Sequence, residues 1–150
     1  MITIETRPWL EVRDAAYAIR YAVFVKEQGI PAELEIDDYD PIAEHVLAFI
    51  DGQCVATARI YPDEQDPSKA KIGRMAVLKN FRDQGIGTAL LGEAIRVGMM
   101  QGASVFELHA QQSAASFYAK LQFKPDGAIF NEVGIPHQRM RLVLGAPVPQ

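Results

Sequence analysis

Short apolar stretches separated by polar ones run along the whole chain, and the spacing of the apolar residues changes from stretch to stretch. Residues 2–6 alternate apolar and polar, which predicts a first strand. Residues 9–26 place apolar side chains at helical spacing, which predicts a helix with one face packed on a sheet. Two apolar runs, 45–50 and 53–61, are separated by Asp-Gly, a dipeptide typical of a tight hairpin turn, and they predict a β-hairpin.

The middle of the chain predicts a β-α-β unit. An apolar run at 71–77 is typical of a strand, residues 85–100 have the apolar period of a helix, and residues 104–110 return to a strand pattern. A helical connection favours parallel pairing of the strands that it joins. The remaining patterns predict a short helix over 113–122 and two strands over 127–133 and 138–144.

Composition narrows the classes of protein that fit this pattern. The chain has 150 residues, 49% of them hydrophobic, so we expect a single domain over 1–150 with a loose tail at 145–150. The net charge of -4 argues against a nucleic-acid partner, which selects for a basic face. No apolar stretch approaches the roughly 20 residues that span a membrane, and the charged N-terminus does not fit a secretory leader. Cys54 has no cysteine partner and is interpreted as a small core residue. We therefore expect a cytoplasmic protein without a membrane or nucleic-acid partner.

The segment before the second predicted helix carries the clearest indication of a ligand. Gly85 and Gly87 lie where that helix begins, so unpaired backbone N–H groups can point into one space with no Cβ in the way. The positive end of the helix dipole favours a phosphate or pyrophosphate there, with Arg82 as a charged partner. A dinucleotide-binding fingerprint would need a third glycine at Leu90, and a P-loop would need Gly-Lys-Ser/Thr; neither is present. A nucleotide-binding regulator stays an alternative.

Five carboxylates fall within the eight residues 33–40. Such a run is interpreted either as a solvated acidic loop or as a wall that attracts a cationic amine. Its spacing does not match a calcium-binding loop, because the central glycine and the closing glutamate are missing. Both interpretations stay open.

Two motifs resemble those of a known enzyme family. Residues 82–87 have the form Arg/Gln-x-x-Gly-x-Gly/Ala, which resembles the coenzyme A pyrophosphate loop of the GCN5-related N-acetyltransferase (GNAT) family. Residues 114–123 read A-x-x-F-Y-x-K-L-x-F and are similar to the second signature of that family. Residues 23–40 and 134–137 further resemble the bacterial ElaA/YjcF-like branch. The resemblance implies a GNAT fold of the mixed α+β class. Such a fold has a central mixed, mostly antiparallel sheet of about seven strands, a central β-α-β acetyl-CoA-binding unit and flanking helices.

Two positions depart from the family pattern. Gln122 stands where the second signature has glycine, which predicts a different helix end. Gln111 stands where many members have asparagine, and its amide can make similar hydrogen bonds to the pantetheine arm.

The resemblance also implies roles for individual residues. The backbone N–H of Val77 is the expected donor to the oxyanion, and Tyr118 is the expected general acid for the departing thiolate. Acetyl-CoA is the expected co-substrate, and no metal is expected. The implied cofactor-binding residues are Met75, Ala76, Val77, Arg82, Gln84, Gly85, Ile86, Gly87, Thr88 and Gln111. The implied substrate-binding residues are Glu27, Asp37, Asp38 and His137.

The general base is left open by the sequence. A lysine-like amine is almost fully protonated at pH 7, so its attack on an acetyl group needs a base or a water relay. The candidate side chains are Glu27, Asp37, Asp38, His45, His109 and His137, and the spacing favours none of them.

The predicted function is acetyl-CoA-dependent transfer of an acetyl group to a primary amine of a small molecule or peptide, by direct attack in a ternary complex. The protein is expected to be a monomer or a homodimer. The alternative function is a non-catalytic GNAT-like module that binds or senses acyl-CoA.

Overall fold

The computed structural model describes residues 1–145, so the expected tail at 145–150 lies outside the described residues apart from Gly145. The chain divides into two compact units, each assembled from two stretches of sequence. Unit 1 comprises Met1–Tyr61 and Ile72–Val97, and unit 2 comprises Pro62–Lys71 and Gly98–Gln150. The expectation that both form one functional domain stays a prediction.

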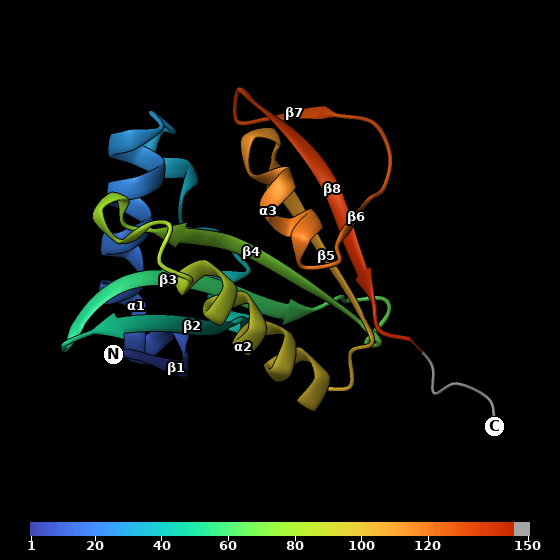
Figure 1. Ribbon diagram of the computed structural model, residues 1–150, viewed down its shortest axis with the longest axis horizontal. Coiled ribbons are helices and arrows are strands. Elements are labelled where there is room, and N and C mark those ends of the chain that lie inside the picture. The colour runs from blue at the N-terminus through green and yellow to red at the C-terminus, as the bar shows by residue number, and fades with distance from the viewer. Residues whose placement is uncertain (146–150) are drawn as a thin grey trace. The chain divides into compact units, whose positions relative to one another are not determined.

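Strands and helices follow one another in the predicted order, with some shorter helical turns between them (Figure 1). The strands are β1 (Ile2–Pro8), β2 (Glu44–Ile50), β3 (Gln53–Pro62), β4 (Lys69–Val77), β5 (Val105–Gln111), β6 (Lys124–Pro125), β7 (Phe130–Glu132) and β8 (Ile135–Val143). The α-helices are α1 (Trp9–Arg20), α2 (Ile86–Met100) and α3 (Ala115–Lys120). A π-helix follows α1 (Tyr21–Glu27), and 3₁₀ turns cover Ala32–Leu34, Asp40–Ile42, Lys79–Phe81 and Gln112–Ala114.

Four strands of unit 1 pair in the order β1-β2-β3-β4. β1 and β2 are antiparallel along their full length, from Ile2 opposite Ile50 to Pro8 opposite Glu44. The turn between β2 and β3 has positive φ at both Asp51 (50°) and Gly52 (82°), as a type I′ hairpin requires, so the predicted turn is confirmed.

Two helical segments of unit 1 bury the apolar faces that the sequence predicts. Ala16, Ile19 and Val23 are buried on the first segment, and Leu90 and Ala94 are buried on α2. The first segment differs from the prediction in one respect, because the α-helix gives way to a π-helix after Arg20. The π-helix covers only seven residues, which is too few for its longer period to show in the apolar spacing.

The strands of unit 2 pair in the order β5-β8-β6, and β7 also pairs with β8. β5 and β8 are antiparallel, from Val105 opposite Val143 to Gln111 opposite His137. The mixed α+β class with mostly antiparallel strands is confirmed, with eight strands in the described residues. Two-residue β6 accounts for the difference from about seven, because so short a strand leaves no apolar pattern.

The end of α3 corrects the expectation raised by Gln122. Gln122 has φ 76°, the left-handed conformation that glycine adopts most readily. Its N–H donates to the Ala119 carbonyl at 3.1 Å, and the Phe123 N–H donates to the Tyr118 carbonyl at 3.1 Å. These two bonds form the Schellman motif that usually has glycine at the left-handed position. The prediction of a different helix end is therefore wrong, because glutamine takes the conformation of the glycine it replaces.

Candidate functional site

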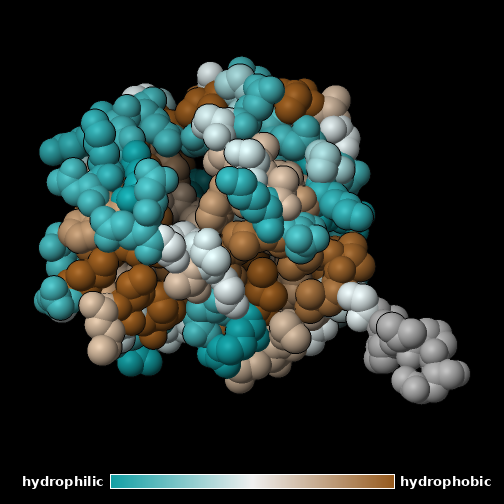
Figure 2. Space-filling model, in the orientation of Figure 1, coloured by the Kyte–Doolittle hydropathy of each residue, from teal (hydrophilic) through white to brown (hydrophobic). Residues whose placement is uncertain are grey.

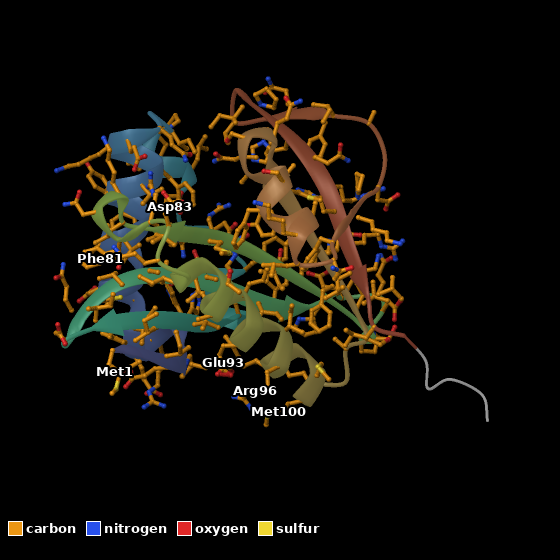
Figure 3. All side chains as sticks on the ribbon, in the orientation of Figure 1. Met1, Phe81, Asp83, Glu93, Arg96 and Met100 are labelled. Atoms are coloured by element: carbon orange, nitrogen blue, oxygen red, sulfur yellow. The ribbon has the colours of Figure 1, made fainter. Side chains whose placement is uncertain are left out.

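In unit 1, residues 82–85 connect the 3₁₀ turn Lys79–Phe81 to α2, and Figure 3 labels Phe81 at the end of that turn and Asp83 on the loop. Asp83 and Gly85 have φ of 62° and 80°, so the backbone turns twice through the left-handed region before the helix begins. The first intrahelical bond runs from the Ala89 N–H to the Gly85 carbonyl at 3.1 Å. The three amides before Ala89 therefore have no partner within the helix.

The start of α2 is suited to a bound anion. Gly85 is exposed and carries no side chain that would cover the amides, while Ile86 is buried and anchors the first turn in the core. The first turn holds no acidic residue that would compete for these N–H groups. The helix dipole adds a positive end at the same place. Figure 2 shows mainly hydrophilic atoms over the part of unit 1 that holds residues 21–28 and 79–85.

Arg82 forms a two-pronged ion pair with Glu27. Its Nη1 and Nη2 each donate to a Glu27 carboxylate oxygen at 2.6 Å, and its Nε donates to the Val77 carbonyl at 2.9 Å. Their hydrogen bond is the main cause that lowers the pKa of Glu27 and raises the pKa of Arg82. The structure thus joins a predicted cofactor-binding residue to a predicted substrate-binding residue, a contact that sequence reasoning missed.

The end of β4 holds three predicted cofactor-binding residues. Ala76 is buried, whereas Met75 and Val77 are partly exposed, as alternation along a strand requires. Arg74, directly before them, has φ 50°, so the strand departs from regular extended geometry at that point. The Leu78 N–H donates to the Val55 carbonyl at 2.9 Å, which holds the end of β4 against β3.

An acid–arginine cluster accounts for most of the acidic run. It consists of Arg20, Glu35, Asp37, Asp40, Arg59 and Arg74, all in unit 1. Arg20 contacts Glu35 and Asp40 at 2.8 Å each, and Arg59 contacts Asp40 at 2.9 Å and Asp37 at 2.6 Å. Arg74 contacts Glu35 and Asp37 at 3.3 Å each. Three carboxylates are therefore neutralised by three guanidinium groups.

The members of the acidic run differ in how deeply they are buried. Arg20, Glu35 and Asp40 are almost fully buried, whereas Glu33 and Asp38 are exposed. Burial alone would raise the pKa of Asp40, but hydrogen bonds and charges from Arg20 and Arg59 lower it to about 2. Burial would also raise the pKa of Asp37, but a hydrogen bond from Arg59 and the charges of Arg59 and Arg74 lower it. Of the two predicted substrate-binding aspartates, only Asp38 is exposed.

In unit 2, Tyr118 lies between two aromatic rings. Phe117 and Phe123 contact it edge-on, with ring centroids 5.0 and 6.0 Å away. Burial raises the pKa of Tyr118 to about 12, so its hydroxyl keeps its proton at physiological pH. Gln111 lies directly opposite His137 in the β5–β8 register, so a predicted cofactor-binding residue and a predicted substrate-binding residue are neighbours.

Comparison with known proteins identifies the family. A family model described as an acetyltransferase (GNAT) domain matches residues 13–144. The chain belongs to the GNAT acetyltransferase family. It is 34% identical to the uncharacterised N-acetyltransferase YjcF of Bacillus subtilis over 131 residues, which cover 87% of this chain and 91% of that protein.

Solved structures of GNAT relatives agree with this assignment. The crystal structure of Escherichia coli ElaA superposes with a TM-score of 0.83 at 28% identity, covering 94% of this chain and 99% of that chain. An acyl-CoA N-acyltransferase from Pseudomonas aeruginosa gives a TM-score of 0.83 at 26% identity, covering 94% and 99%. The predicted family, its acyltransferase class and the likeness to ElaA and YjcF are confirmed.

The candidate bases of this GNAT protein differ in what surrounds them. Glu27 and Asp37 are each paired with arginine, and their lowered pKa values make them weaker bases. His45 is 1% exposed, with its Nε2 3.0 Å from the Asp40 carbonyl oxygen, and burial is the main cause that lowers its pKa. His137 is buried, and its Nδ1 donates to the Ile135 carbonyl at 2.7 Å. His109 is exposed, with its Nδ1 3.0 Å from Glu132.

Other groups bear on the chemistry only indirectly. Burial raises the pKa of the Cys54 thiol, so the thiol stays protonated at neutral pH. Within residues 1–145, no group of three or more His, Cys, Asp or Glu side chains is arranged to hold a metal ion. None of the helices in that range is long and apolar enough to cross a membrane.

Proposed function

We propose that this GNAT protein is an acetyl-CoA-dependent N-acetyltransferase that moves an acetyl group to a primary amine by direct attack in a ternary complex. The observation that carries the proposal is the loop before α2, where Gly85 exposes three helix-terminal amides in a chain of the acetyltransferase family. The diphosphate of coenzyme A is an anion of the kind that such a helix start binds.

The residues around that loop suit the diphosphate of acetyl-CoA. The amides of Ile86, Gly87 and Thr88 would donate to its oxygens, with Gln84 and Arg82 beside them. Met75, Ala76 and Val77 would hydrogen-bond the pantetheine arm through their backbone, and Gln111 would do so through its amide. When bound, acetyl-CoA supplies an activated thioester for the amine to attack.

Two groups of the chain would assist the transfer. The Val77 N–H would donate to the carbonyl oxygen as it gains negative charge. The Tyr118 hydroxyl would donate to the departing sulfur. Its pKa of about 12 lies well above the roughly 8.5 of an ordinary thiol, so we expect the hydroxyl to stabilise the departing thiolate as a hydrogen-bond donor. Any proton that it passes to the sulfur would be replaced by the proton that the attacking nitrogen loses.

The acceptor would be the primary amine of a small molecule or a peptide. Asp38 would contact it directly, because Glu27 and Asp37 already hold arginines, and buried His137 would support the binding site from behind. Glu27 would act on the site through Arg82, and Asp37 through the acid–arginine cluster.

The remaining parts of the proposal concern the state of the protein in the cell. We propose that residues 1–150 act as one acetyltransferase domain, as a monomer or homodimer in the cytoplasm. Light scattering of the purified chain would give its mass in solution. Cell fractionation with an antibody against the chain would locate it.

Thermal unfolding with added ligands tests the proposed cofactor. Acetyl-CoA at a hundred times its dissociation constant should add about 2.7 kcal/mol of stability, while ATP and NADH should add far less. A larger shift with ATP would favour a nucleotide-binding regulator and overturn the proposal.

Release of free CoA thiol with a panel of primary amines then separates the enzyme from an acyl-CoA sensor. An enzyme turns over at least one amine, and Tyr118→Phe lowers its kcat by about 100-fold while leaving the acetyl-CoA stability shift in place. Saturable acetyl-CoA binding without any turnover would favour the sensor.

A further inference from the structure

Three side chains from three strands of unit 2 form a histidine–glutamate cluster: His109 on β5, Glu132 on β7 and His137 on β8. The Glu132 carboxylate lies 3.0 Å from His109 Nδ1 through one oxygen and 3.8 Å from His137 Nε2 through the other. The Phe130 ring contacts His109 edge-on at 5.1 Å and stacks on His137 at 6.0 Å. One carboxylate and one aromatic ring therefore hold two imidazoles that are 28 residues apart in the sequence.

The contact with Glu132 determines which nitrogen of His109 can accept a proton. A carboxylate accepts hydrogen bonds, so His109 Nδ1 carries the hydrogen and donates it to Glu132. In the neutral ring, the lone pair is then on Nε2. A carboxylate that fixes the tautomer of an imidazole in this way is the usual support of a histidine base.

Exposure distinguishes His109 from the other histidine of the cluster. The His109 side chain is 46% exposed, so an incoming amine can approach the ring, whereas the His137 side chain is 6% exposed. Imidazole is also the side chain whose ordinary pKa lies nearest to physiological pH, and it is a stronger base than a carboxylate. Exposed Asp38 is the weaker choice for this reason.

The neighbours of His109 place it among residues already assigned to the reaction. It is two residues from Gln111 on the same face of β5, and Gln111 is opposite His137. The charged groups around it are Glu132 from β7, Arg139 directly opposite on β8, and Glu107 two residues back on β5. Asp126, which pairs with Arg139 at 3.3 Å, reduces the positive charge beside the ring.

We infer that His109 is the general base of the acetyl transfer and that Glu132 is the residue that positions it. The inference rests on the proposed function. His109 Nε2 takes one proton from the ammonium form of the acceptor, and the resulting imidazolium later releases it to water. The neutral amine forms the C–N bond as the C–S bond breaks. The second proton lost by the nitrogen ends on the CoA sulfur, so each turnover releases one proton to solvent.

The test is the pH dependence of kcat/KM for His109→Gln, measured by CoA release with the best primary amine found in the panel. At pH 7 we expect a loss of about 100-fold relative to the unmodified protein. The loss should shrink steadily toward pH 10, because an alkyl amine with a pKa near 10.4 then loses its proton unaided. A merely structural role would give a loss that does not depend on pH.

Two further variants complete the test. Glu132→Gln should give a smaller loss of kcat/KM at pH 7 that also shrinks toward pH 10, because a ring whose tautomer is no longer fixed presents its basic nitrogen to the amine less often. Glu93→Gln is the matched control, since Glu93 pairs with Arg96 within α2, where Figure 3 labels both residues, and α2 contributes no residue to the cluster. It should leave the profile unchanged.

The outcomes separate this inference from the proposed function. If the unmodified protein turns over no amine, the proposed function fails, and the inference fails with it. If it turns over an amine and His109→Gln has the same kcat/KM at pH 7, only the inference is overturned. All variants should keep the stability gain from acetyl-CoA, which shows that they are folded. If His109→Gln loses the stability gain from acetyl-CoA, the test rests on Glu132→Gln instead. A kcat/KM profile over pH that is unchanged in Glu132→Gln then contradicts the inference.

Discussion

The two polar clusters of this protein differ in how completely their charges are paired. In the acid–arginine cluster of unit 1, Arg20 and Asp40 are almost fully buried, and each charge contacts one or more of opposite sign. In the histidine–glutamate cluster of unit 2, His109 and Glu132 are each at least 40% exposed, and the ring keeps one nitrogen for other partners. Complete pairing in a buried place fixes structure, whereas partial pairing in an exposed place leaves a group that can react.

The same comparison shows that a dense run of charged residues in the sequence is not by itself a reactive site. Five carboxylates in eight residues were interpreted either as a solvated loop or as a wall that attracts an amine, yet three of them neutralise arginines. The histidines are isolated in the sequence and showed no ligand spacing, yet two of them converge on Glu132. We therefore expect substitutions in the first cluster to change stability most and substitutions in the second to change rate most.

The largest expected effect on stability comes from Arg20→Ala. This variant leaves Glu35 and Asp40 buried with less positive charge around them, which should cost about 3–5 kcal/mol of unfolding free energy. Urea unfolding measures the loss. Arg13→Ala is the control, because the exposed pair of Arg13 and Asp14 should contribute less than about 0.5 kcal/mol. A loss below 1 kcal/mol for Arg20→Ala would contradict the importance of the cluster.

Acid should weaken the same cluster through the protonation of Asp40. The pKa of Asp40 is lowered to about 2 in the folded protein from 3.8, so its contribution is complete above about pH 4 and is lost as the pH falls toward 2. The difference corresponds to about 2 kcal/mol. Unfolding free energy measured at pH 6, 4, 3 and 2 gives this slope. Asp40→Asn should be less stable at pH 6 and should show a shallower fall; equal slopes would contradict the assignment to Asp40.

A glycine substitution tests the left-handed backbone conformation at the end of α3 in unit 2. Gln122→Gly relieves a left-handed conformation at the end of α3 and should raise stability by about 1 kcal/mol, because the strain removed exceeds the entropy that glycine adds to the unfolded chain. Thermal unfolding measures the gain. Lys120→Gly, two residues earlier within α3, should instead lower stability, and a gain there would show that φ is not the cause.

The smallest expected stability change belongs to the exposed pair of Glu27 and Arg82. Glu27→Gln should cost only about 0.5 kcal/mol, because both side chains are 35% exposed and water solvates the separated charges. The same change releases Arg82 from a competing carboxylate, so the stability gain from a fixed concentration of acetyl-CoA should increase. Calorimetric titration with acetyl-CoA measures the affinity. Weaker binding would instead show that Glu27 holds Arg82 in the orientation that the ligand needs.

Much of the fold could be predicted because its signals are local. Alternation gave β1, helical spacing gave α2, and Asp51-Gly52 gave the hairpin with both residues at positive φ. The turn before α2 was also predicted, and Gly85 has φ of 80° there; the role of residues 82–87 in binding a ligand stays a prediction. The π-helix and two-residue β6 were missed because neither changes the local pattern enough to be seen.

The sequence by itself determined the family and the order of the elements, because these depend on residues that are close together in the chain. Only the tertiary structure decided which charges are paired. Arg20 meets Asp40, Arg82 meets Glu27, and His109 meets Glu132 across 20, 55 and 23 residues of sequence. Strand register and helix packing bring these groups within hydrogen-bond distance. Distance and burial, rather than composition, then determine which groups stabilise the fold and which are available for chemistry.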